Sequence, residues 1–360
     1  MSENALVEKQ RKSNVELLRI FAMVLIILHH YALHGGLSSI AGFGVNKYIG
    51  TICLIGGKLA VNLFVLISGY FLIESEFKLK KVLKLILQVY CYSVAFFIIY
   101  VIFKGIPTGE IIKLTAFPFT SKAYWFVLPY ICVYVLSPFI NKFIKSISQK
   151  QLISLIGILI FMFSGVGFFI SDSGLMNNLA WFVLIYLIGA YIRLYDFNRF
   201  SKKAINCFSV IGYVLFIIIA CGITYMSQYN ASIFRFVNKI SSMNSIIVLV
   251  EAVLVFMVFK NLDIKNSRVI NVLGKSSIGV YLFHDSIFRN EFWKNIFKVE
   301  SFYYAEWYLL ILHIVGCTVA IYLIGTIIEV IRIKLIEEQI FKIKKFDKWF
   351  EKIDNGMEIE

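Results

Sequence analysis

Long apolar stretches recur along the chain and are separated by short polar segments. A helix needs about 20 mostly apolar residues to cross the hydrocarbon core of a bilayer. Ten stretches meet this requirement, at residues 15–35, 49–72, 82–103, 122–143, 151–170, 177–195, 205–226, 244–260, 270–288 and 307–331. The pattern therefore predicts an all-α fold, a polytopic transmembrane helix bundle of about ten spans.

Basic residues gather in every second connection between these stretches. They precede the first stretch and follow the second, fourth, sixth, eighth and tenth, as Lys9, Arg11, Lys12, Lys78, Lys80, Lys81, Lys84, Lys142, Lys145, Lys150, Arg193, Arg199, Lys202, Lys203, Lys260, Lys265, Arg268, Arg332 and Lys334. The remaining connections, such as SDSGLMNN, are nearly neutral. Because basic loops stay in the cytoplasm, the alternation predicts that both termini are cytoplasmic. An odd number of spans would break it.

The segment 335–353 has a different pattern. Isoleucine and phenylalanine recur there at helical spacing, with lysines between them. This is typical of an amphipathic helix lying on the cytoplasmic leaflet, and a solvated tail is the alternative. We therefore divide the chain into a transmembrane domain, residues 1–334, and a basic amphipathic tail, residues 335–360.

Composition supports a membrane protein. Of the 360 residues, 59% are hydrophobic and 16% are charged, whereas soluble domains carry about 25% charged residues. The net charge of +14 lies in the short basic connections, so we read it as a signal of orientation and not of nucleic-acid binding. The six cysteines form no CxxC pair and no metal-ligand spacing, and we expect no bound metal.

The first stretch carries charged and titratable residues that apolar spans normally exclude. At about 100° per residue, Arg19 and His30 differ by only about 20° around the helix axis. Glu16 and His34 each lie about 60° from Arg19 on the same side, whereas His29 lies about 80° away on the other. An arginine inside a span normally faces a polar cavity, although Arg19 could instead extend to the interface and pair with Glu16. The shared stripe favours a functional site.

Other stretches supply further candidates. LFVLISGY places Ser68 in the second span, where a serine that only packs between helices is the alternative. The fourth span opens with an interfacial pair that includes Trp125. The ninth span, rich in glycine and serine, ends in Tyr281 and His284, and Arg289 follows as a candidate glycan contact.

Four of these segments resemble the motifs of the bacterial integral-membrane acyltransferase-3 family. They are the pair Arg19 and His30 with ten residues between them, LFVLISGY (63–70), the Trp-led YWFVLPYICVYVLSPFI (124–140) and LGKSSIGVYLFH (273–284). The resemblance covers about residues 14–331. Many members have a glutamate soon after the tryptophan, and no acid follows Trp125 in that segment. The chain is thus more similar to the branch that modifies capsular polysaccharide and exopolysaccharide.

The resemblance implies transfer of an acetyl group from acetyl-CoA to a hydroxyl of a surface glycan or its lipid-linked precursor, at a bacterial cell membrane. A sugar hydroxyl is a weak nucleophile, so His30 is assigned as general base or acyl relay. Arg19 would bind the phosphates or pantetheine of coenzyme A, or stabilise the thioester oxyanion. Acetyl-CoA is expected as a co-substrate, with no tightly bound cofactor. At 1.5 Å per residue His30 lies about 24 Å into the first span, past the midplane toward the outside.

A lipid-linked sugar transporter or a polysaccharide polymerase is the alternative function, because both are polytopic and line a path with buried charges. Two features argue against it: the sequence has no detectable two-fold repeat, and its polar residues cluster in the first, second and ninth spans. Glu251, in the eighth span, must face other helices, and His313, in the tenth, is expected to be structural.

Overall fold

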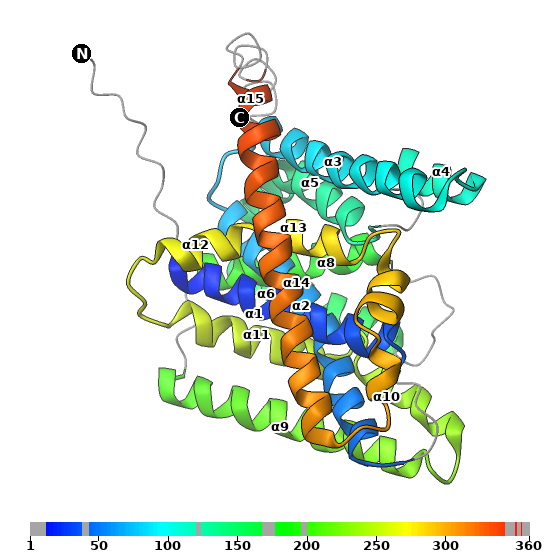
Figure 1. Cartoon of the computed structure of the whole chain (residues 1–360). Coiled ribbons are helices and arrows are strands. Elements are labelled where there is room, and N and C mark those ends of the chain that lie inside the picture. Colours follow the sequence, from blue (N-terminus) through cyan, green and yellow to red (C-terminus); the bar gives the residue numbers. More distant parts are fainter. Residues whose placement is uncertain are drawn as a thin grey trace.

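The regular elements of the described residues are all helical, as the apolar pattern predicts (Figure 1). The computed structural model describes residues 12–37, 43–119, 124–167, 177–195, 200–342, 350 and 354. The longer helices are α1 (Ser13–His34), α2 (Val45–Leu72), α3 (Leu79–Lys104), α5 (Val127–Ser146), α6 (Gln149–Ile160), α8 (Asn178–Leu194), α9 (Lys202–Met226), α11 (Ile246–Lys260) and α14 (Trp307–Arg332). The shorter ones are α4 (Gly109–Ala116), η2 (Phe161–Val166), η3 (Ala231–Phe234), α10 (Arg235–Ile240), α12 (Arg268–Lys275), α13 (Ser277–His284), η4 (Glu291–Ile296), η5 (Val299–Phe302), η6 (Ile333–Glu337) and α15 (Glu338–Phe341).

Seven helices of the described chain are long and apolar enough to cross a membrane, which makes this a multi-pass membrane protein but does not confirm ten spans. They are Ser13–His34, Val45–Leu72, Leu79–Lys104, Val127–Ser146, Gln149–Val166, Lys202–Met226 and Trp307–Phe341. Two further predicted spans correspond to shorter helices, α8 with 17 residues and α11 with 15. The ninth, 270–288, is divided into α12 and α13.

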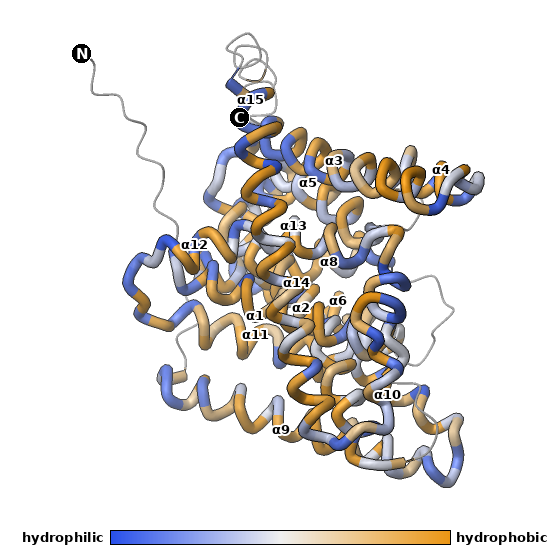
Figure 2. Tube along the Cα trace, viewed as in Figure 1, coloured by the Kyte–Doolittle hydropathy of each residue, from blue (hydrophilic) through white to orange (hydrophobic). Residues whose placement is uncertain are grey.

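Helices α1 and α2 form the centre of the bundle. They pack extensively on each other; α1 also contacts α11, α12, α13 and α14, and α2 contacts α8, α9 and α11. In Figure 1 the long α14 crosses α1 and α2, with which it is in contact. Figure 2 shows α14 as mostly hydrophobic, and hydrophilic residues gathered around α12 and its adjoining loop. The polar side chains of α1 and α2 are therefore enclosed by neighbouring helices.

Two glycines allow α2 and α8 to approach closely. A Cβ on Gly69 would lie 2.3 Å from the Tyr186 carbonyl oxygen, and one on Gly189 would lie 2.6 Å from the Leu66 oxygen. Real Cβ atoms do not come so near, so only glycine fits this crossing. Small residues commonly permit such backbone contact between membrane helices. The crossing fixes α2, which carries part of the site described below.

Helices α12 and α13 follow each other with Ser276 between them. Ser276 has φ −81° and ψ −6°, in the right-handed helical region, and the hydrogen bonds from Ser276 N to the Val272 oxygen and from Val280 N to the Ser276 oxygen continue across it. Beyond it every residue of α13 is buried except Ile278, and the helix ends at His284. The predicted span 270–288 is thus divided at Ser276, and His284 at the end of α13 lies against His30 of α1.

Helix α14 continues through η6 into α15 without interruption, across the proposed domain boundary at residue 334. Arg332 pairs with Glu329 and Glu337, each at 2.7 Å, and Lys84 of α3 pairs with Glu337 at 2.9 Å. The start of the tail thus packs on α3. Most of the predicted amphipathic segment 335–353 lies outside the described residues.

Candidate active site

Two histidines from distant parts of the sequence meet inside the bundle. His30, near the end of α1, places Nδ1 3.0 Å from Nε2 of His284, the last residue of α13. The side chains are 254 positions apart in sequence, and both are buried. Residues of the first and ninth predicted spans therefore form one polar centre.

The hydrogen bonds of this pair assign the ring protons. Nδ1 of His284 lies 2.6 Å from the Val280 carbonyl oxygen, which can only accept, so Nδ1 carries the proton. Nε2 of a neutral His284 is then an acceptor, and His30 must donate to it from Nδ1. In a neutral His30 this leaves Nε2 with a free lone pair. The Val280–His284 chain thus selects the tautomer in which His30 can act as a base.

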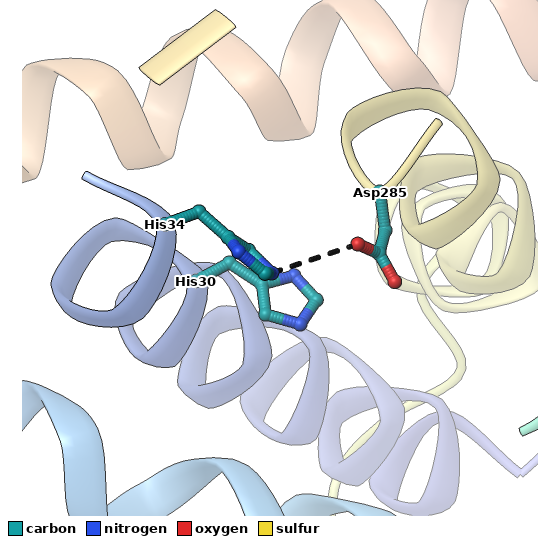
Figure 3. Close-up of side chains that lie close together, drawn as sticks. All are labelled: His30, His34 and Asp285. Atoms are coloured by element: carbon teal, nitrogen blue, oxygen red, sulfur yellow. Dashed lines mark ion pairs between the residues drawn. The ribbon is translucent and has the colours of Figure 1, made fainter. Parts of the chain in front are cut away.

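An acidic residue lies beside the pair. Asp285 follows His284, is buried, and contacts His34 of α1, with 3.8 Å between Nε2 and Oδ1. Figure 3 shows His30 and His34 on α1, with Asp285 facing them from the end of α13. Arg289 lies 3.4 Å from the same carboxylate oxygen. Asp285 therefore links the end of α1 to the predicted outer-face residue Arg289.

His30, His34 and Asp285 are also the residues that could hold a metal ion, since their ligand atoms all lie within 4.8 Å of one another. Nitrogen and oxygen ligands bind zinc at about 2.0–2.2 Å and tetrahedrally, which requires ligand atoms about 3.5 Å apart. The ligand atoms of the three residues would have to move closer together to bind an ion. Nδ1 of His30 already takes part in the hydrogen bond with His284, which leaves Nε2 of His30 for an ion.

A cavity opens beside His30. It encloses about 650 Å³, including its open mouth, and lies among α1, α2, α3, α5 and α13. The lining side chains that carry a polar group are His29, His30, Lys58, Trp125, Tyr130 and Tyr281. Apolar residues complete the wall, so the cavity suits a small reactive group held away from bulk water.

His29 lines this cavity as well, although the helical spacing predicts that it lies off the stripe shared by Arg19 and His30. Its Nδ1 lies 2.6 Å from the Leu54 carbonyl oxygen. Gly57 packs against the ring, where a Cβ would come within 2.3 Å of it. α1 and α2 pack so closely here that the cavity reaches both histidines.

Lys58 is a site residue that the sequence reasoning missed. It stands near the middle of α2, lines the cavity, and places Nζ 4.2 Å from the centroid of the Trp125 ring. A lysine at the centre of a span costs about 2.5–3.5 kcal/mol on insertion scales, so its presence is a signal of function. That signal was available in the sequence GGKLAVN.

Arg19 lies apart from this cavity. It pairs with Glu16 one helical turn earlier, and 27% of its side chain is exposed. Glu16 is buried beside Gly274 of α12. His30 follows Arg19 by eleven positions, about 16 Å along the axis. Arg19 is not among the described residues that line this cavity or the neighbouring one.

Of the remaining candidates, two line the cavity and one contacts a residue that lines it. Trp125 and Tyr281 line it, and the Tyr281 ring lies 6.4 Å from that of His284. Ser68 does not line it, but its hydroxyl lies 3.1 Å from the Tyr130 hydroxyl, which does. Ser68 therefore holds a wall residue in position.

A second cavity continues from the first. The two share Leu85, Tyr130 and Ile278 as lining residues, and the second encloses about 830 Å³, including its mouth. Its charged lining residues are Lys81, Lys84, Lys275, Arg332, Glu329 and Glu337. Four are basic and two acidic, so the second cavity favours a negatively charged group and leads toward His30.

Two further titratable residues outside these cavities have local roles. Glu251 accepts a hydrogen bond from Ser209 at 3.0 Å, between α11 and α9. His313 of α14 bonds the Tyr31 hydroxyl at 2.7 Å and stacks on Phe302 with ring centroids 3.8 Å apart. Both contacts tie helices together.

A family model described as an acyltransferase domain, that of the acyltransferase-3 family, matches residues 12–330. Comparison with curated proteins gave no match. Comparison with solved structures gave none either. The match covers α1 to α14, including both histidines of the buried pair. The chain therefore belongs to the acyltransferase-3 family and is a membrane acyltransferase.

Proposed function

We propose that the protein transfers an acetyl group from acetyl-CoA to a hydroxyl of a capsular, exopolysaccharide or other surface glycan, or of its lipid-linked precursor, in a bacterial cell membrane. The observation that carries the proposal is the buried His30–His284 pair at the end of two joined cavities. The chemistry requires a base that is ready at neutral pH and shielded from competing water.

The joined cavities support coenzyme A as the carrier. Phosphate groups favour a basic mouth, and Lys81, Lys84 and Lys275 line the second cavity, whereas the first is narrower and mostly apolar. A molecule with phosphates at one end and a thioester at the other matches this order. Arg19 lines neither cavity but lies toward the end of α1 that follows the basic N-terminal segment, and from there it would attract the phosphates toward the second cavity.

The reaction uses His30 as general base. Nε2 of His30 takes the proton of the sugar hydroxyl as its oxygen attacks the thioester carbon, and a tetrahedral intermediate forms. The intermediate collapses with cleavage of the C–S bond, and the proton passes from His30 to the leaving thiolate. His284, held by the Val280 carbonyl, keeps the ring of His30 oriented through both steps.

The test is transfer of radiolabel. Membranes that contain the full chain are incubated with [¹⁴C]acetyl-CoA and a hydroxyl-bearing surface glycan from the producing cells. We expect label in the glycan with the wild-type chain, and none with His30→Ala. His313→Ala, which removes a histidine outside the cavities, is the matched control and should transfer label normally. Absence of label in the glycan with the wild-type chain would refute the proposal.

A further inference from the structure

Lys58 carries a positive charge that its own protein surroundings do not neutralise directly. Among the described residues it has no hydrogen-bond or ion-pair partner for its ammonium group, and its contact is the face of the Trp125 ring. An ammonium group has three donors, and burial without acceptors costs free energy. A ligand that accepts from Lys58 would recover this cost.

The acidic group whose charge acts on Lys58 already has other partners. Asp285 exerts an electrostatic effect on Lys58, but its carboxylate lies against Arg289 and faces His34. Asp285 thus offsets part of the charge at a distance, without occupying the ammonium. The donors of Lys58 remain for a group in the cavity that it lines together with His30.

We propose that Lys58 is a catalytic residue that stabilises the oxyanion formed on the acyl carbonyl, a role that the geometry denies to Arg19. The proposal rests on the acyl transfer proposed above. When the hydroxyl oxygen bonds to the thioester carbon, the π electrons of the carbonyl move to its oxygen. That oxygen then carries the negative charge beside Lys58. The electrons return when the C–S bond breaks.

The separation along α1 excludes Arg19 from the same step. Its Cα lies about 16 Å along the axis from that of His30, and its guanidinium group is directed to Glu16. The base and the oxyanion donor must act on neighbouring atoms of one intermediate, about 3 Å from each. Lys58 and His30 line one cavity, whereas Arg19 lines neither of the two.

Trp125 serves Lys58 as a positioning residue. A cation held 4.2 Å from an indole centroid is attracted to the ring face, and the ring shields it from water. The contact holds the lysine stem toward the cavity in the absence of substrate. This gives Trp125, which lies just before α5, a role that needs no acid beside it.

The experiment compares Lys58→Met with Lys47→Met in the purified full chain. Lys47 is the matched control: it is on the same helix and also lies over an aromatic ring, that of Phe234, but outside the cavity. Loss of one oxyanion donor lowers kcat by about 100- to 1,000-fold. We expect that loss for Lys58→Met with little change in KM for acetyl-CoA, partial activity for Lys58→Arg, and normal activity for Lys47→Met.

Binding provides a second measurement that does not depend on turnover. Carboxymethyl-CoA carries a carboxylate one carbon beyond the position of the thioester carbonyl, which brings anionic oxygens close to the place where the oxyanion would form. We expect the wild-type chain to bind it about tenfold more tightly than coenzyme A, and Lys58→Met, but not Lys58→Arg, to lose the preference. If an active wild-type chain loses neither kcat nor this preference on substitution to methionine, the role of Lys58 is refuted and acyl transfer stands. A wild-type chain that transfers no acetyl group refutes both.

Discussion

At the residue scale, the site joins side chains whose roles depend on one another. His30 can accept a proton at Nε2 because its Nδ1 donates to His284, and His284 accepts because its own Nδ1 proton is bonded to the Val280 carbonyl. A backbone carbonyl thus determines the state of the base through one intervening ring. Outer hydrogen bonds of this kind orient reactive histidines in many sites.

Substitutions of the pair should therefore be unequal. His30→Ala removes the base and should lower kcat by about 100- to 10,000-fold. His284→Ala removes an orienting partner and should lower kcat by about 10- to 100-fold, because the ring of His30 remains. Steady-state acetyl transfer checks both. An equal and complete loss for the two variants, with both folded, would show that His284 contacts the reacting atoms itself.

Arg19→Lys separates a binding role from a catalytic one. A lysine cannot reproduce the planar guanidinium fork, so we expect severe impairment. If Arg19 binds phosphates, the loss appears mainly as an increase in KM for acetyl-CoA, with kcat little changed. Arg193→Lys is the control, since Arg193 pairs with Glu74 at the end of α8, away from both cavities. A fall in kcat without a change in KM would instead indicate that Arg19 stabilises the oxyanion.

His29→Ala measures how far the helical stripe can be taken. The spacing placed His29 off the stripe, and we expect a smaller loss of acetyl transfer than for His30→Ala. Its ring nevertheless lines the cavity and is held by the Leu54 carbonyl, so the loss should be measurable. Equal rates for the two variants would contradict the argument from helical spacing.

The sequence predicted single residues of this site better than the contacts between residues of different helices. Arg19 and His30 were proposed because the spacing of charged and titratable residues on one helix is local information; His30 lines the cavity, whereas Arg19 does not. The contact of His30 with His284 depends on packing across 254 positions, which no periodicity records. Lys58 was overlooked because one lysine does not disturb the apolar pattern of a long span. Asp285 was overlooked because it follows the motif that ends in His284.

At the element scale, the neighbours of α2 are harder to predict from sequence than the helix itself. Its apolar pattern correctly predicts a span, but its neighbours are determined by glycines. Gly57 admits the ring of His29, and Gly69 with Gly189 admits α8. The predicted ninth span shows the opposite case: its composition favours one helix, whereas the structure has two helices that meet at Ser276. Composition alone does not reveal this division.

Gly69→Ala should destabilise the α2–α8 crossing. The new Cβ would lie 2.3 Å from the Tyr186 oxygen, and overpacking of this kind costs about 1–3 kcal/mol. Thermal unfolding in detergent should show a lower Tm. Gly222→Ala on α9 is the control, because a methyl group added there would meet no atom within 4 Å among the described residues. At that position alanine should leave the Tm unchanged or raise it, through its better helix propensity.

At the scale of the whole molecule, the basic loops, the second cavity and the buried pair suggest a direction. The predicted cytoplasmic lysines that follow α2 include Lys81, in the first turn of α3, which lines the second cavity. His30 lies near the opposite end of α1, four residues before its last residue, His34. Reporter fusions after residues 80 and 200 should report cytoplasm, and fusions near 40 and 172 should report the outside. The same signal on both sides of α2 would refute this topology.

The direction of the reaction can be tested in sealed inside-out vesicles. Acetyl-CoA is supplied in the bath, which contacts the predicted cytoplasmic face. The acceptor glycan is present as two pools, one enclosed in the lumen and one in the bath. Because the first cavity reaches His30 past the middle of α1, about 26 Å from its first residue at 1.5 Å per residue, we expect acetylation of the lumenal glycan. Vesicles with His30→Ala should acetylate neither pool. Modification restricted to glycan in the bath would mean that both substrates enter from the cytoplasmic face, and that the acetyl group does not cross.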